Sequence, residues 1–118
     1  MRFVRFRSNL RGLIANANWP DLVAYEEVRR HMGVDAAHVY GGLIAVLQEE
    51  CELRNPKIPY LGVPVGTVKK LATGRGNASK AEMMQAARDR WPGWSPVDDN
   101  EADARWTAAA GVQEVSDD

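Results

Sequence analysis

Residues 67–80 read TVKKLATGRGNASK, and this stretch decides how the rest of the chain is interpreted. No acid lies between Arg54 and the end of the stretch. Gly74 predicts the left-handed end of one helix, and Ser79 or Asn77 predicts the cap of a second helix. Backbone N–H groups and cations that meet at such a turn suit a phosphate backbone, although a solvated turn between two helices explains them as well. The stretch holds four of the 15 Lys and Arg residues: Lys69, Lys70, Arg75 and Lys80.

Two sharper phosphate-binding motifs do not fit this stretch. A Walker A loop needs Lys followed by Ser or Thr, and here Ala81 follows Lys80. A dinucleotide fingerprint needs three glycines between a strand and a helix, whereas Gly74 and Gly76 follow a predicted helix. The sequence therefore favours contacts with phosphates along a nucleic-acid backbone over a nucleotide-binding loop.

The length and charge of the chain suit one globular domain with an uneven surface. The 118 residues are 45% hydrophobic and 26% charged, so we expect a single domain over residues 1–112 and a frayed acidic tail over residues 113–118. The net charge of −1 combines a basic start, in which no acid precedes Asp21, with an acidic end over residues 98–118. A metal-using enzyme of nucleic acids has this distribution, and so does an ordinary solvated surface.

The cysteine count and the hydropathy pattern narrow the cellular context. Cys51 is the only cysteine, so neither an intramolecular disulfide nor a cysteine zinc site can form. His31 and His38 lack a third histidine or an HExxH frame, which disfavours a histidine metal site. Arginines interrupt every early apolar run, and no apolar segment approaches the ~18 residues that a membrane span needs. We therefore expect a cytoplasmic protein without a membrane partner.

The periodicity predicts an α/β fold of about three strands with flanking helices. Residues 1–7 (MRFVRFR) alternate apolar and basic side chains and predict a strand, as do residues 22–25 and 58–63. The longest helix is expected over residues 36–53, with Asp35 as its N-cap and close packing at Gly41 and Gly42. The order of these elements predicts at least two parallel strands.

Acids at a strand end and at a helix start are the candidates for chemistry. Glu26 follows a predicted buried strand, and sites in open α/β sheets form at the carboxyl ends of strands. Glu27 points the opposite way if the strand continues. Asp99, Asn100 and Asp103 open the last helix, where N-capping and the helix dipole explain them equally well. Carboxylates from this helix that met Glu26 would make an oxygen-rich site suited to Mg²⁺ or Mn²⁺.

Taken together, these stretches resemble the RuvC-like Holliday junction resolvases of the RNase H-like superfamily, especially the short phage and prophage forms. VAYEEV resembles the strand that ends in the family's second acid, which falls on Glu26. Residues 67–80 resemble the family's basic segment, whose two DNA-contacting lysines fall on Lys69 and Lys80. DDNEADA resembles the closing acidic motif, whose last acid falls on Asp103. The resemblance covers residues 21–111.

The resemblance implies metal-dependent cleavage of branched DNA. Glu26 and Asp103 would bind Mg²⁺ or Mn²⁺ with help from Asp99 or Asn100, and the phosphates would be held by Lys69, Lys70, Arg75 and Lys80. Two departures set the chain apart. The family's Asp-x-Gly strand is missing, so we expect an RNase H-like fold without its first β-hairpin, and Asn100 stands where the family has an acid. The sheet edge that the missing hairpin leaves uncovered predicts a homodimer or larger species, with residues 1–7 and the helix of Gly41 and Gly42 as the contacts. The alternative is a DNA-binding or dimer-forming module that kept the fold without catalysis.

Overall fold

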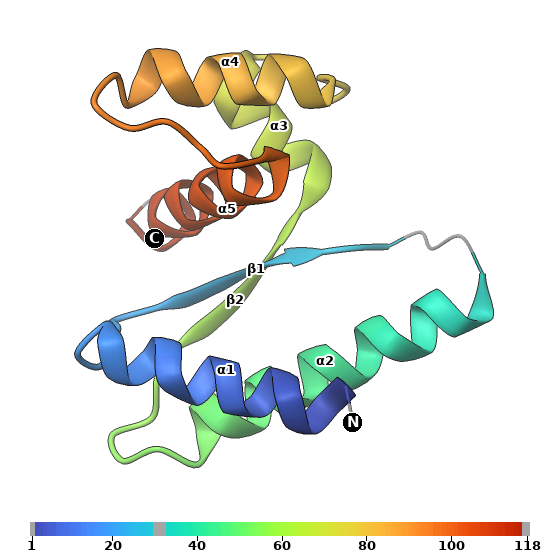
Figure 1. Ribbon diagram of the computed structural model, residues 1–118, viewed down its shortest axis with the longest axis vertical. Coiled ribbons are helices and arrows are strands. Elements are labelled where there is room, and N and C mark those ends of the chain that lie inside the picture. The colour runs from blue at the N-terminus through green and yellow to red at the C-terminus, as the bar shows by residue number, and fades with distance from the viewer. Residues whose placement is uncertain (1, 30–32, 117–118) are drawn as a thin grey trace. The chain divides into compact units, whose positions relative to one another are not determined.

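The computed structural model describes residues 2–29 and 33–116 (Figure 1). The predicted α/β class is confirmed, with two parallel strands joined in sequence by a helix. None of the described helices is both long and apolar enough to cross a membrane. In chain order the elements are α1 (Arg2–Asn16), β1 (Val23–Glu27), α2 (Val34–Glu52), β2 (Tyr60–Pro64), α3 (Val65–Thr73), α4 (Lys80–Arg90) and α5 (Asp99–Ser116).

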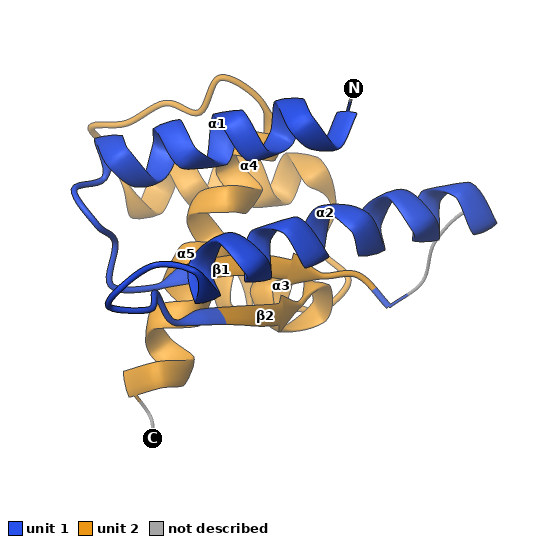
Figure 2. Ribbon diagram, turned by 90° about the horizontal axis from the view of Figure 1, so that it is seen from below, with its two compact units in different colours: residues 1–23, 29–60 blue, residues 24–28, 61–118 orange. Residues whose placement is uncertain are grey.

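The chain divides into two compact units, coloured separately in Figure 2. Unit 1 comprises residues 1–23 and 29–60 and contains α1 and α2. Unit 2 comprises residues 24–28 and 61–118 and contains most of both strands with α3, α4 and α5. A single domain over residues 1–112 stays a prediction.

The strand predicted over residues 1–7 is wrong, because residues 2–7 begin helix α1. When the residues that follow are included, the apolar pattern fits a helix, since Leu10 and Ile14 lie one turn apart and both are buried. Arg7 and Arg11, also one turn apart, form ion pairs with the same residue, Glu50 of α2. The described chain therefore has two strands where the sequence predicts about three.

Unit 1 is held together by a buried carboxylate and by a close helix approach. The side chain of Glu50 is 1% exposed and accepts hydrogen bonds from Arg7, Arg11 and Arg54 at 2.5, 2.6 and 3.3 Å. The close packing predicted for the glycine pair is found at Gly42, where an added Cβ would lie 2.5 Å from the ring of Phe3. No such neighbour lies near Gly41. A side chain at position 42 would therefore displace the ring of Phe3.

Unit 2 has a continuous apolar core that joins β2 to its three helices. Trp106 of α5 is 6% exposed and packs 4.7 Å from the ring of Trp91, measured between ring centroids. The guanidinium of Arg105 lies 4.3 Å from the Trp91 ring and 4.6 Å from the Trp94 ring, which ties the loop after α4 to α5. The buried core residues of unit 2 are Val63, Val68, Ala78, Met83, Ala87, Ala102, Trp106 and Ala110.

Two helix ends differ from prediction. Helix α5 continues through Ser116, so residues 113–116, predicted to fray, are helical. Asp35, predicted as an N-cap, lies instead in the first turn of α2, which begins at Val34. In both cases the helix runs further than the sequence signals place it, by two residues at the start of α2 and by four at the end of α5.

Candidate metal and phosphate site

Unit 2 brings together the two acids that the sequence predicts as metal ligands. Glu26 comes from β1 and Asp103 from the second turn of α5, and both line a hollow of about 20 Å³. The hollow is also lined by Lys69, and its apolar walls come from Val65, Val68 and Met83. Its volume is close to that of one water molecule. The site is therefore a small, largely apolar recess with two carboxylates and one ammonium group.

The electrostatics of the recess disfavour two ionised carboxylates. Burial raises the pKa of Glu26, and the charge of Asp103 raises it further, while Lys69 opposes the shift. Burial also raises the pKa of Asp103, with repulsion from Asp99 adding to the rise and Lys69 and Lys80 opposing it. A cation that entered the recess would relieve both penalties, because it would offset the lost hydration and the mutual repulsion.

Asp99 and Asn100, the two residues at the start of α5 that were expected to assist the metal ligands, have different surroundings in the structure. Asn100 lines a second hollow of about 230 Å³ that Glu26 and Asp103 also line. Asp99 lines neither hollow, and its carboxylate lies 3.6 Å from the ammonium nitrogen of Lys80. Glu27 is absent from the lining of both hollows, which agrees with its lesser rank as a candidate. An amide at Asn100 is thus better placed than Asp99 to reach a group held by the pair.

Two residues of the site were missed by the sequence reasoning. Thr107 is buried, lines both hollows and donates its hydroxyl hydrogen to the carbonyl oxygen of Asp103 at 2.7 Å. It follows Asp103 by one helical turn, so the helical period could have identified it. Tyr25 lines the larger hollow and packs on Gly62, where an added Cβ would lie 2.9 Å from the ring. No sequence signal marks this tyrosine.

The basic stretch has the predicted local structure. Gly74 ends α3 in the left-handed conformation and donates its N–H to the carbonyl oxygen of Lys70 at 2.8 Å. Ser79 begins α4 with a capping box, in which its hydroxyl and the Glu82 carboxylate each accept a backbone N–H. The chain therefore turns tightly between α3 and α4, as residues 67–80 predict.

The four predicted phosphate-binding cations have different surroundings. Lys69 is half-buried beside the carboxylate pair, whereas Lys70 and Lys80 are exposed. Arg75 forms an ion pair with Glu82, the acid of the capping box. The structure thus brings Lys69 to the predicted metal ligands and sets Lys80 beside Asp99, while Arg75 has an acidic partner of its own.

The donor set fits one divalent cation. In residues 2–29 and 33–116, no group of three or more His, Cys, Asp or Glu side chains is close enough to hold a metal ion. His38 is exposed on α2, and His31 lies outside the described residues. Glu26 and Asp103 alone supply two carboxylates, which matches the way Mg²⁺ is held by one or two carboxylates together with waters and substrate phosphates. An anchor for a second cation is not found within the described part of the chain.

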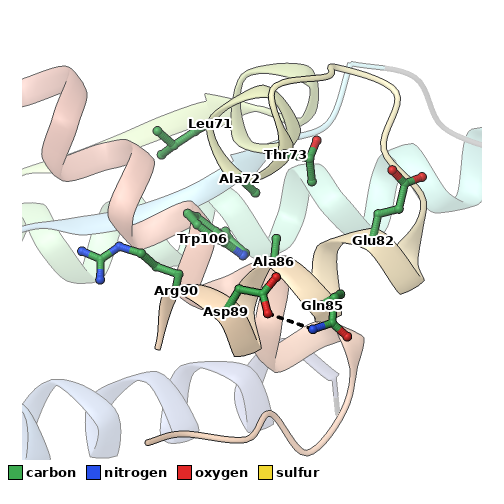
Figure 3. Close-up of a pocket in the computed structure, with 9 residues that line it drawn as sticks. All are labelled: Leu71, Ala72, Thr73, Glu82, Gln85, Ala86, Asp89, Arg90 and Trp106. Atoms are coloured by element: carbon green, nitrogen blue, oxygen red, sulfur yellow. Dashed lines mark hydrogen bonds between the residues drawn. The ribbon is translucent and has the colours of Figure 1, made fainter. Parts of the chain in front are cut away.

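A larger groove in unit 2 contains none of the predicted site residues. It has a volume of about 710 Å³, and Figure 3 shows Trp106 against Ala72 and Ala86 with Asp89 and Gln85 nearby. The amide of Gln85 donates to the carboxylate of Asp89 at 2.9 Å. The indole N–H of Trp106 has no hydrogen-bond partner among the described residues. This groove is separate from the carboxylate recess in its lining residues.

The backbone is similar to that of two solved structures. Thermus thermophilus RuvC in complex with a Holliday junction substrate matches with a TM-score of 0.80 and 21% identity, over 92% of this chain and 65% of that chain. A second Thermus thermophilus RuvC structure matches with a TM-score of 0.73 and 18% identity, over 96% and 69% of the two chains. Neither a protein-family model nor a curated protein sequence matches the chain. The chain therefore has a RuvC-like fold and spans about two thirds of the length of the RuvC chains that it matches.

Proposed function

We propose that the chain is a divalent-metal-dependent DNA endonuclease of the Holliday junction resolvase type. The proposed reaction hydrolyses a phosphodiester of branched DNA and leaves a 5′-phosphate and a 3′-hydroxyl. The observation that carries the proposal is the recess of unit 2, where Glu26, Asp103 and Lys69 come together on a RuvC-like fold. The matched structure of RuvC with a Holliday junction substrate supports the substrate class.

The chemistry of the recess suits a phosphodiester. Mg²⁺ or Mn²⁺ held by Glu26 and Asp103 would stabilise negative charge on the phosphoryl oxygens and lower the pKa of the attacking water. Lys69 can donate a hydrogen bond to a phosphate oxygen from within the recess, while the exposed Lys70 and Lys80 attract the flanking phosphates. Asn100 can orient a water molecule, because its amide both donates and accepts.

The test of this proposal separates metal binding, DNA binding and cleavage. Mn²⁺ and Mg²⁺ should raise the melting temperature of the native sequence and should raise it far less for Glu26→Gln/Asp103→Asn, since both carboxylates are then neutral. Glu27→Gln is the matched control, because it removes an acid of the same strand that lines neither hollow. An equal metal-induced shift in all three proteins would rule out the predicted metal site.

Cleavage of a four-way junction should be slow or absent for the 118-residue chain in Mg²⁺. Hydrolysis with two metals needs them about 3.5–4 Å apart, and Glu26 and Asp103 offer no anchor for the second. Mn²⁺ should restore a trace of cutting. Robust cutting in Mg²⁺ would show that another acid, either Asp99 after a rearrangement or one from a partner subunit, completes the site.

The second candidate function is a DNA-binding or dimer-forming module without catalysis. The number of acids in the recess favours it, because the recess has two carboxylates rather than three. The substitutions Lys69→Gln and Lys80→Gln should each weaken DNA binding in either case. Each should also reduce the slope of log K against log salt by roughly one unit, because each cation releases about one counterion. DNA binding that is weakened by these two substitutions, together with a melting temperature that metal does not change, would favour the non-catalytic module.

A further inference from the structure

Helix α1 carries a second set of basic residues that the carboxylate site does not use. Its arginines divide between two faces of the helix. Arg7 and Arg11 turn toward the acids of α2 and are paired with Glu49 and Glu50. Arg2 and Arg5 lie on another face, and the structure records no ion pair for either of them within residues 2–29 and 33–116. Two cations of unit 1 are therefore left facing solvent.

These two arginines border a groove within unit 1. The groove has a volume of about 420 Å³ and is lined by Arg2, Arg5, Phe6 and Asn9 of α1 and by Leu43 of α2. The four α1 residues follow the spacing i, i+3, i+4, i+7, so they share one face of the helix. Phe6 and Leu43 are half-buried, whereas Arg2, Arg5 and Asn9 are exposed. The groove thus has an apolar floor and a rim of two guanidinium groups and one amide.

Helix stability does not account for the arginines at the rim. The first turn of α1 contains no acid, although acids there stabilise a helix and cations oppose the positive end of its dipole. Within α1 there is also no acid at i+3 or i+4 that could pair with Arg2 or Arg5. The cations lie where they slightly weaken their own helix, so attraction of an anionic ligand explains them better than helix stability does.

We propose that the groove lined by Arg2, Arg5, Phe6 and Asn9 is a second nucleic-acid contact, which binds backbone phosphates of DNA outside the carboxylate recess. Two planar guanidinium groups match the bidentate geometry of phosphate oxygens. The amide of Asn9 adds a donor of the kind that contacts phosphate and sugar oxygens. The ring of Phe6 gives a surface on which an unstacked base can lie. The contact is sequence-independent and its strength falls with salt.

The test measures binding of a labelled four-way junction and a labelled single strand over a range of salt concentrations. Arg2→Gln/Arg5→Gln in the full chain should weaken binding of both DNAs and reduce the slope of log K against log salt by roughly two units. Asn9→Asp keeps both arginines and places a carboxylate one turn from Arg5, so it should weaken binding in the same direction. Arg88→Gln is the matched control, an exposed arginine of α4 for which the described residues show no ion pair. It should reduce the slope by less than one unit.

The outcomes distinguish this inference from the proposed nuclease function. Unchanged DNA binding in Arg2→Gln/Arg5→Gln, with an unchanged circular dichroism spectrum, would overturn the second contact whatever the metal experiments show. Weaker binding in this variant, together with no metal-induced stabilisation of the native sequence, would support the second contact and count against the nuclease. Loss of binding to phosphatidylserine vesicles with DNA binding intact would identify the groove as a lipid-surface contact and overturn the proposal.

Discussion

At the scale of single residues, the carboxylates of Glu26 and Asp103 oppose folding when both are ionised. Their pKa values are raised in the folded state, from ordinary values of 4.5 and 3.8, chiefly by burial. A carboxyl with a raised pKa holds its proton more tightly when folded than when unfolded. Its contribution to folding stability therefore becomes unfavourable as the pH rises from the ordinary pKa through the raised pKa. Above the raised pKa the full destabilisation applies.

We therefore expect Asp103→Asn to stabilise the protein at pH 7. The substitution removes one of two repelling, partly buried charges, and the melting temperature should rise by a few degrees without added metal. The gain should shrink as the pH falls and vanish below 3.8, where the native carboxyl is protonated as well. Melting curves recorded by circular dichroism at steps of roughly one pH unit, from pH 3 to pH 8, would measure the gain in melting temperature. A variant less stable than the native protein at pH 7 would contradict the expectation.

The residues that form the recess were partly accessible from the sequence. Glu26 and Asp103 could be predicted because an acid at a strand end and an acid at a helix start are local signals. Thr107 and Tyr25 were missed because their importance depends on what faces them, and that is a property of packing rather than of sequence spacing. The contact of Asp99 with Lys80 could not be predicted for the same reason, since it joins two helices.

At the scale of helices and strands, a short window of sequence can predict the wrong element where contacts with a distant segment determine the secondary structure. Residues 1–7 alternate like a strand, but Phe3 and Phe6 also fit a helical spacing. The ion pairs of Arg7 and Arg11 with Glu50, about 40 residues away in sequence, lie outside any such window. By contrast, the left-handed helix end at Gly74 is a local signal and was predicted correctly, and of the two predicted caps, Ser79 and Asn77, the structure has Ser79. Local chemistry thus predicts the α3–α4 turn but not the identity of α1.

The pairing of α1 with α2 gives a prediction about the buried carboxylate of Glu50. Hydrogen bonds from the arginines, with Arg11 first, lower its pKa from 4.5 to about 2. Glu50→Ala would leave three partly exposed guanidinium groups without their shared acceptor, so the free energy of unfolding should fall by about 1.5–3 kcal/mol. Glu49→Ala is the control: its side chain is 53% exposed, and it should cost about 0.5 kcal/mol or less. Urea denaturation followed by circular dichroism measures both.

The same carboxylate has a predictable dependence on acid. A lowered pKa means that Glu50 stabilises the folded state above its ordinary value of 4.5 and that this contribution is lost as the pH falls toward 2. The difference in stability between the native protein and Glu50→Ala should therefore narrow over that interval. A difference that is independent of pH would show that packing, rather than charge, holds α1 to α2.

At the scale of the whole molecule, we expect a homodimer. The sequence suggests residues 1–7 and the Gly41–Gly42 pair as contacts, but Phe3 packs on Gly42 within unit 1. In unit 2, Val112 and Val115 of α5 lie three residues apart, share a helix face and are 58% and 53% exposed. Exposed apolar pairs of this kind suit an interface between subunits.

Light scattering at tens of micromolar protein would test the dimer. The native sequence should have twice the mass of the chain, and Val112→Glu/Val115→Glu should shift the equilibrium toward monomer. Val97→Glu is the control, because Val97 is 84% exposed and lies outside the helices. A native protein that is monomeric at this concentration would contradict the prediction, and a dimer that survives both substitutions in α5 would place the interface elsewhere.

The packing of Trp91, Trp94 and Trp106 makes unit 2 distinguishable by its light emission. All three indoles belong to unit 2, and Trp91 and Trp106 are close enough for their excited states to interact. The fourth indole, Trp19, belongs to unit 1 and is 44% exposed, so its fluorescence resembles that of tryptophan in water. With Trp19→Phe, the remaining emission reports on unit 2 alone. The loss of structure in unit 2 can then be timed within the full chain, without an attached dye.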